Sequence, residues 1–146
     1  MAAGLREMAR AVAPTAAPQS TDRLTVTSVL IAEDEPSIVE SLAFLLRRAG
    51  YDVASVLDGE AAIRRLQNDP PDIMILDLML PRRNGFEVLK VVKGDPALAS
   101  MPVLVLSAKG QPQDRRLAEE IGVDAFMTKP FSNRDVVEEV RRLTSG

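Results

Sequence analysis

The stretch DIMILDLMLP, residues 72–81, sets one carboxylate inside an otherwise apolar run, because Asp77 is the only charged residue between Ile73 and Leu80. A short apolar run bounded by turn residues is typical of a buried strand in a parallel sheet. An unpaired carboxylate within such a strand would cost several kcal/mol. We therefore expect Asp77 at the carboxyl end of the strand, where α/β folds place their ligand sites. We interpret it as a reactive carboxylate rather than a structural one.

Strand-like and helix-like segments alternate along the chain from Ser28 onward. Besides the run that ends at Asp77, strands are expected at 29–32, 51–56, 102–106 and 125–127. Helices are expected at 36–49, 58–68, 84–94, 112–122 and 132–143. This alternation predicts a doubly wound α/β fold of the (βα)5 type. Right-handed crossovers favour a five-stranded parallel sheet with the flavodoxin-like strand order 2-1-3-4-5.

Helical spacing defines the expected inner faces of the helices. In the first helix the inward residues are Ile38, Leu42, Leu45 and Ala49, and in the third they are Phe86, Leu89 and Val92. Asp58, Asn84 and Ser132 precede three of the helices, where a side-chain oxygen can accept from a free backbone amide. The charges of the last helix predict a salt-bridged outer face.

Composition excludes several classes of function. The 146 residues, 46% of them hydrophobic, suffice for the core of one ordinary domain. The chain has no cysteine and no histidine, which excludes disulfides, Ser–His triads and histidine-liganded metals. Any bound metal would have to be a hard, oxygen-liganded ion such as Mg²⁺, Mn²⁺ or Ca²⁺. A net charge of −3 argues against nonspecific nucleic-acid binding, and without a long apolar run we expect no membrane span and a cytoplasmic location.

Residues 1–27 differ in composition from the rest of the chain. They are rich in Ala, Pro, Ser and Thr and show little periodicity. We predict a mobile tail here, followed by one domain at 28–146. Alternatively, Leu5, Met8 and Val12 could line one face of a short helix. A secretory signal is rejected, because the segment lacks an apolar central region.

Polar side chains are expected to converge at one edge of the sheet. Glu33 and Asp34 follow the first strand, Asp77 ends the third, Ser107 follows the fourth and Lys129 follows the fifth. Three neighbouring carboxylates repel one another, which favours a bound divalent cation. A lysine and a hydroxyl beside them can contact phosphoryl oxygens. This set of groups suits phosphoryl transfer onto Asp77.

Four motifs carry a resemblance to a known family. They are VLIAEDEP at 29–36, DLMLP at 77–81 followed by Asn84-Gly85, SAK at 107–109, and TKPF at 128–131. In this order and at these spacings, over about residues 27–143, they are highly specific. The sequence resembles the receiver domains of response regulators, which are the phosphoacceptors of two-component systems.

The resemblance implies roles for the residues at the strand ends. Asp77 would be the phosphorylated residue. Asp34 and Asp77 would ligate Mg²⁺ (or Mn²⁺) together with the backbone carbonyl of Met79, and Glu33 would contribute through water.

The resemblance also implies a conformational switch. Ser107 and Phe126 would form the switch pair, with the hydroxyl moving to the phosphoryl group and the ring turning inward. Lys129 would assist catalysis, and its bond to Pro130 resembles the cis peptide of the family. The switch would act on the surface of the helix at 112–122, the strand at 125–127 and the helix at 132–143.

The implied partner is a sensor histidine kinase or a histidine phosphotransfer protein, because this chain has no histidine of its own to donate the phosphoryl group. Output would pass through an unknown protein or an effector domain of a longer regulator, and a homodimer stays open. The sequence departs from the family pattern at two places. Arg82-Arg83 stands where small or acidic residues are common, and these arginines either form a solvated surface or bias partner choice. Ala125 stands where many members carry a second acidic residue, which weakens the case for the dimer contacts of the DNA-binding subfamilies.

Two other functions compete with the phosphoacceptor. A phosphatase of the haloacid-dehalogenase type also uses an aspartate nucleophile with Mg²⁺, but it needs an acid two residues further on, and here that residue is Met79. A pseudo-receiver would share the fold and bind partners without phosphorylation. The intact carboxylates and lysine count against it. Nucleotide-binding glycine motifs are missing from the sequence.

Overall fold

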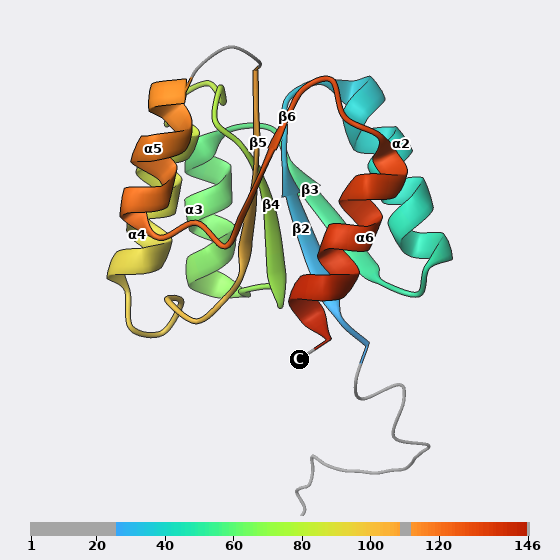
Figure 1. Cartoon of the computed structure of the whole chain (residues 1–146). Coiled ribbons are helices and arrows are strands. Elements are labelled where there is room, and N and C mark those ends of the chain that lie inside the picture. Colours follow the sequence, from blue (N-terminus) through green and yellow to red (C-terminus); the bar gives the residue numbers. More distant parts are fainter. Residues whose placement is uncertain (1–25, 109–111, 146) are drawn as a thin grey trace, which may run out of the picture.

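The computed structural model describes residues 26–108 and 112–145 of the chain. Strands and helices alternate throughout these ranges (Figure 1). The elements are β2 (Ser28–Ala32), α2 (Pro36–Arg48), β3 (Asp52–Val56), α3 (Gly59–Asn68), β4 (Ile73–Asp77), α4 (Gly85–Gly94), β5 (Val103–Ser107), α5 (Pro112–Ile121), β6 (Ala125–Thr128) and α6 (Asn133–Thr144). The predicted tail lies almost wholly outside the described residues. None of the described helices is long and apolar enough to cross a membrane.

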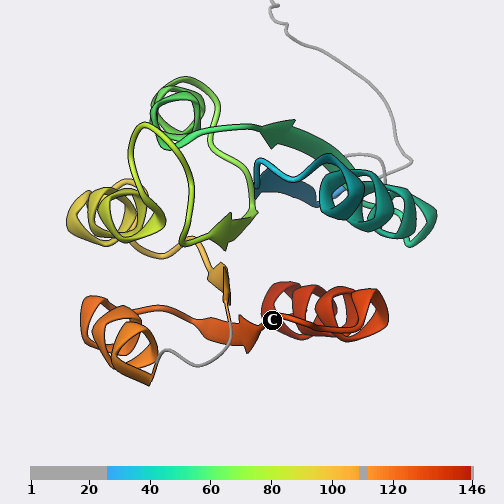
Figure 2. The ribbon, with the colours of Figure 1, turned by 90° about the horizontal axis from the view of Figure 1, so that it is seen from above.

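The strands form one parallel sheet in the order β3-β2-β4-β5-β6. Counted along the chain from β2, this is the predicted order 2-1-3-4-5. Helices α2 and α6 cover one face of the sheet, and α3, α4 and α5 cover the other (Figure 2). The order reverses at β2, which has β4 on one side and β3 on the other, and a doubly wound sheet places its ligand site at such a point.

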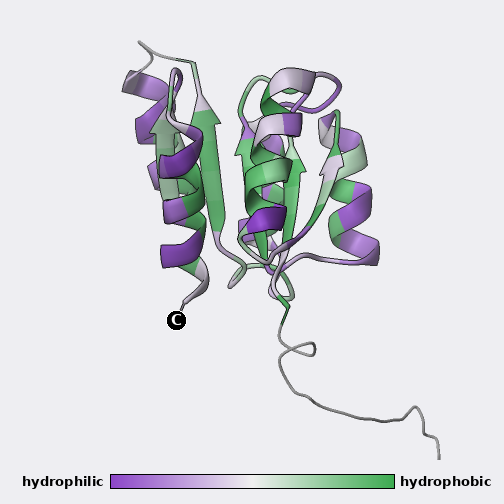
Figure 3. Cartoon of the chain, turned by 90° about the vertical axis from the view of Figure 1, so that its right-hand side faces the viewer, coloured by the Kyte–Doolittle hydropathy of each residue, from purple (hydrophilic) through white to green (hydrophobic). Residues whose placement is uncertain are grey.

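Strand β4 divides the core into two layers. All five of its residues are buried. Met74 and Leu76 pack in the cluster under α3 to α5, whereas Ile73 and Ile75 pack in the cluster under α2 and α6. This alternation follows from the two-residue period of a strand. The central strands are hydrophobic along most of their length, and the helices turn polar faces outward (Figure 3).

The inner face of α2 differs from the predicted one. Leu42 is buried as expected, but the other buried residues are Ala43 and Leu46, while Leu45 is only half-buried and Ala49 is exposed. Leu46 follows Leu42 by four residues and so lies on the same face of the helix. Ala49 is past the last helical residue, Arg48, and therefore cannot continue the face. In α4 the prediction is confirmed for Leu89 and Val92, whereas Phe86 is half-buried.

The predicted helix caps form. The Asp58 side chain accepts from the amide of Ala61 at 2.8 Å. The Asn84 side chain accepts from the amide of Glu87 at 3.1 Å, and Ser132 caps α6 in the same way. On the outer face of α6, Arg141 pairs with Glu138 at 3.3 Å and Arg142 pairs with Glu139 at 2.7 Å, as the charge pattern predicted.

The open edge of β3 is partly covered by a side chain. The guanidinium of Arg47, in the last turn of α2, donates to the carbonyl oxygen of Val53 at 3.1 Å. On the other side of β3, Asp52 and Val56 bond toward β2. Val53 alternates with them and therefore directs its polar groups outward.

The loop between β4 and α4 is tied to its surroundings by backbone hydrogen bonds. The amide of Gly85 donates to Leu78 at 3.0 Å and closes the loop. The amide of Gly59 donates to Pro81 at 3.1 Å and holds the loop against the start of α3. Arg82, between these ties, has a φ of 73°, which is left-handed and unfavourable for a residue with a side chain.

We predict that Arg82→Gly stabilises the protein by about 1 kcal/mol, because glycine adopts a left-handed φ without steric cost. The ion pair of Arg82 with Glu60 is exposed and at 3.5 Å offsets little of this gain. The matched control is Arg83→Gly in the same loop, because Arg83 pairs with Glu87 but has an ordinary φ. Urea unfolding should show a gain for the first variant and a loss for the second, and a loss in both would contradict the argument.

Candidate functional site

The ends of β2 and β4 bring three carboxylates together. Glu33 and Asp34 directly follow β2, and Asp77 is the last residue of β4. One oxygen from each of the three lies within 4.8 Å of the others. Glu33 is 1% exposed and Asp77 is 2% exposed, whereas Asp34 is exposed. The strand register causes this convergence, because Ala32 pairs with Leu76 across the sheet.

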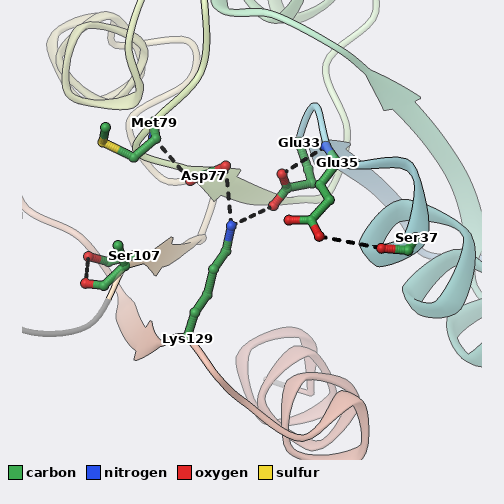
Figure 4. Close-up of polar contacts among 8 residues, drawn as sticks. Glu33, Glu35, Ser37, Asp77, Met79, Ser107 and Lys129 are labelled. Carbon is green, nitrogen blue, oxygen red and sulfur yellow. Dashed lines mark hydrogen bonds and ion pairs between the residues drawn. The ribbon is translucent and has the colours of Figure 1, made fainter.

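Lys129 supplies the positive charge of the site. It follows β6, and its ammonium lies 3.3 Å from Glu33 Oε1 and 3.4 Å from Asp77 Oδ2 (Figure 4). Its backbone amide donates to the carbonyl of Ser107 at 2.7 Å, which fixes the chain beside the end of β5. The peptide bond between Lys129 and Pro130 is cis, as expected from the resemblance.

Backbone amides orient both buried carboxylates. The amide of Met79 donates to Asp77 Oδ1 at 3.0 Å, and the amide of Glu35 donates to Glu33 Oε2 at 3.1 Å. The remaining oxygen, Glu33 Oε1, is buried without a hydrogen bond and has only its ion pair with Lys129. A buried oxygen that lacks a hydrogen bond is costly, and a cation would satisfy it.

The site carries excess negative charge. Burial raises the pKa of Glu33 to about 7, and the negative charge of Asp77 adds to the rise. Burial lowers the pKa of Lys129, but Asp77 and Glu33 outweigh this effect and leave that pKa above its ordinary value. Lys129 therefore stays protonated, and it pairs with Glu33 and Asp77 but not with all three carboxylates of the group.

Hard oxygen donors of this kind fit Mg²⁺ or Mn²⁺. Three residues offer carboxylate oxygens within reach of one ion, and the backbone carbonyl of Met79 was predicted as a further ligand. The poorly satisfied Glu33 Oε1 and the net negative charge both favour a cation here. The residues present therefore suit the metal that the resemblance implies.

Ser107 and Phe126 are not part of the carboxylate–lysine cluster. Ser107 ends β5 and is buried, and its hydroxyl donates to the carbonyl of Ala108 at 3.0 Å (Figure 4). Phe126 lies on β6 and is half-buried. The guanidinium carbon of Arg115 on α5 lies 5.3 Å from the centre of its ring.

The matched family model, the response regulator receiver domain, covers residues 29–141. The chain belongs to this family. It is a receiver domain of two-component signalling, a class of signalling proteins that interact with histidine kinases and output domains. Receiver domains bind Mg²⁺ through acidic residues, and the cluster of Glu33, Asp34 and Asp77 is such a group.

Among curated relatives, the domain is 41% identical over 115 residues to the alkaline phosphatase synthesis transcriptional regulatory protein PhoP of Bacillus subtilis. The match covers 79% of this chain and 47% of PhoP, so the chain spans about half the length of this relative.

Two solved structures are similar. The receiver domain of a histidine kinase from Syntrophus aciditrophicus is 35% identical with a TM-score of 0.78, over 83% of this chain and 92% of that one. The phosphorylated cyanobacterial phytochrome response regulator RcpA is 26% identical with a TM-score of 0.75, over 83% of this chain and 96% of that one.

Sequence reasoning did not find the groups that hold the receiver site in place. The amides of Glu35 and Met79 orient the carboxylates, but backbone groups leave no signature in a sequence. Gly85 belongs to the Asn84-Gly85 motif and to the predicted helix start, but neither pattern predicts that it packs against the backbone of Asp77.

We predict that metal-free receiver domain loses stability as the pH rises. The pKa of Glu33 lies above its ordinary value of 4.5, at about 7, so the folded state binds more protons than the unfolded state between these values. The stabilising contribution of the protonated carboxyl is therefore complete below pH 4.5 and lost as the pH rises through 7. The loss is about 3 kcal/mol.

Urea unfolding in EDTA at several pH values measures this effect. Glu33→Gln should flatten the decline and be more stable than the wild type at pH 8. Glu40→Gln, which removes an exposed carboxylate of α2, is the control. A decline of the same size in Glu33→Gln would assign the pH dependence to other groups.

Proposed function

We propose that this receiver domain accepts a phosphoryl group on Asp77 from the phosphohistidine of a sensor kinase or phosphotransfer protein. The observation that carries the proposal is the position of Asp77, whose carboxylate is buried at the end of β4, 3.4 Å from Lys129 and within 4.8 Å of two other carboxylates. An aspartate with a purely structural role would not need to be buried beside a lysine and two other carboxylates, because such burial costs stability. The phosphorylated state of the similar RcpA supports the same role.

The chain's own groups prepare the acceptor for attack. The amide of Met79 holds Asp77 Oδ1, so the carboxylate is oriented before the donor arrives. An Asp77 oxygen forms the new bond to phosphorus while the phosphorus–nitrogen bond of the donor breaks, and the imidazole leaves with the electron pair. Lys129, which remains charged, can then contact a phosphoryl oxygen.

We assign Asp34, Asp77 and the Met79 carbonyl as the residues that would hold Mg²⁺ or Mn²⁺, with Glu33 contributing through water. When bound, the ion neutralises negative charge on the phosphoryl oxygens. The burial of Glu33 beside Asp77 supports this assignment, because the repulsion between them calls for a second cation besides Lys129.

Ser107 and Phe126 would change conformation in response to phosphorylation. The Ser107 hydroxyl would exchange the carbonyl of Ala108 for a phosphoryl oxygen, which is a stronger, charge-assisted acceptor. Phe126 would then turn inward and change the surface formed by α5, β6 and α6. Arg115, which covers the ring, moves with this surface.

The wider role stays a prediction. The cognate kinase, the output protein or effector domain, a homodimer and a cytoplasmic location are expected from the family. We also expect the domain to catalyse only its own phosphorylation and dephosphorylation. Met79 leaves no acid at the position that a haloacid-dehalogenase-type phosphatase requires, so that activity is not proposed.

Intact-protein mass spectrometry tests the acceptor directly. The protein is incubated with a small-molecule phosphodonor such as acetyl phosphate, with Mg²⁺ or with EDTA. We expect one labile phosphoryl adduct that forms with Mg²⁺, does not form with EDTA and is lost in Asp77→Asn. Asp72→Asn, which changes an exposed carboxylate at the other end of β4, should retain the adduct.

Two results would contradict the proposal. An adduct that persists in Asp77→Asn would move the acceptor to another residue. Absence of any adduct while Mg²⁺ still binds would favour a pseudo-receiver that works without phosphorylation.

We further predict that Met79 prolongs the phosphorylated state. Its apolar side chain is 69% exposed beside the acceptor and should obstruct the attacking water. Met79→Asn should therefore dephosphorylate several-fold faster, because a polar side chain can orient that water. Decay of the purified phosphoprotein measures the rate, with Phe44→Asn, a similarly exposed apolar residue on α2, as control. An unchanged or slower decay in Met79→Asn would refute the idea.

A further inference from the structure

The start of α3 lies unusually close to the loop that follows the acceptor. A methyl group on Gly59 would overlap the carbonyl oxygen of Arg83 and come within 2.6 Å of its carbonyl carbon. Both are backbone atoms, so no rotation of a side chain could make room. Only glycine fits at this position as the structure stands.

Gly85, two residues after Arg83, makes a second close backbone contact of the same kind. A methyl group on Gly85 would lie 2.5 Å from the carbonyl oxygen of Asp77 and 2.6 Å from the Cα of Leu78. Three backbone segments are therefore stacked without space between them. They are the start of α3 at Gly59, the loop at 83–85, and the end of β4 at Asp77.

We propose that Gly59 is a positioning residue for the phosphorylation site, acting through the loop at 83–85 on the backbone of Asp77 and on the predicted metal ligand Met79. The inference rests on the proposed function. It adds a residue that lies outside the site motifs and contacts no proposed ligand.

Hydrogen bonds link the two glycines to the segment that contains Met79. The Gly59 amide donates to Pro81 at 3.1 Å, and the Gly85 amide donates to Leu78 at 3.0 Å. Met79 lies between Leu78 and Pro81 in the chain, so both ends of its segment are held by these two glycines. Its amide in turn holds Asp77 Oδ1 at 3.0 Å.

An added methyl group on Gly59 should displace the loop rather than the helix. Helix α3 is anchored by Ala62, Ile63 and Leu66, which are buried, and by the Asp58 cap. In the loop, by contrast, Arg82 and Asn84 are exposed, and Arg83 is only half-buried. The loop therefore gives way more readily, and its displacement reaches Gly85 and the end of β4.

Gly59→Ala tests the inference, with Gly94→Ala as the matched control. Gly94 ends α4, and a methyl group there would meet nothing within 4 Å. Alanine is favourable in both helices, so neither variant weakens its helix directly. NMR titration of backbone amides with Mg²⁺ gives the dissociation constant, and circular dichroism and thermal unfolding report the fold.

We expect Gly59→Ala to weaken Mg²⁺ binding by about 10-fold or more, as for other residues that orient metal ligands. Phosphorylation at limiting Mg²⁺ should slow in proportion, while Gly94→Ala matches the wild type in both measurements. A purely structural role would lower the unfolding temperature and leave the dissociation constant unchanged. That result, in a folded variant, would overturn the inference.

Hydrogen exchange of the unmodified protein provides a second test that needs no variant. If Gly59 holds the loop, Mg²⁺ should slow the exchange of its amide, which donates to Pro81, by several-fold. The same exchange rate with and without Mg²⁺ would overturn the inference even if Gly59→Ala failed to fold. Failure of the wild type to bind Mg²⁺ or accept a phosphoryl group would instead refute the proposed function.

Discussion

The receiver site depends on the burial of carboxylates at one edge of the sheet. Glu33 and Asp77 are withdrawn from water at the ends of β2 and β4, and one ammonium, that of Lys129, lies between them. Such an arrangement costs stability, because burial and repulsion both disfavour the charged forms. The hydrophobic strands behind it and the backbone amides in front of it are what keep it in place.

The order of the sheet and the convergence of the polar residues were predictable, because apolar runs, turn residues and parallel pairing leave few arrangements. The sequence was less informative about which of two adjacent apolar residues is buried when both fit the helical pattern. On α2, Leu45 and Leu46 are both apolar, and Leu46 is the one that packs in the buried cluster under α2 and α6. The tight approach of Gly59 to Arg83 was equally invisible, since it joins residues that no local pattern relates.

The site combines rigid and movable parts. Asp77 and Glu33 are fixed by amides, whereas the Ser107 hydroxyl has a neutral carbonyl partner that it can exchange. Lys129 connects the two regions, because its ammonium contacts the carboxylates while its amide bonds to the backbone of Ser107. A charge change at Asp77 therefore has a direct physical route to the end of β5.

The covered edge of β3 bears on how the protein meets other molecules. Arg47 donates a hydrogen bond to the carbonyl oxygen of Val53, on an edge strand of only five residues. An incoming chain that tried to extend the sheet would find one of its few acceptors already bonded. This bond disfavours the pairing of another strand along the β3 edge of the sheet.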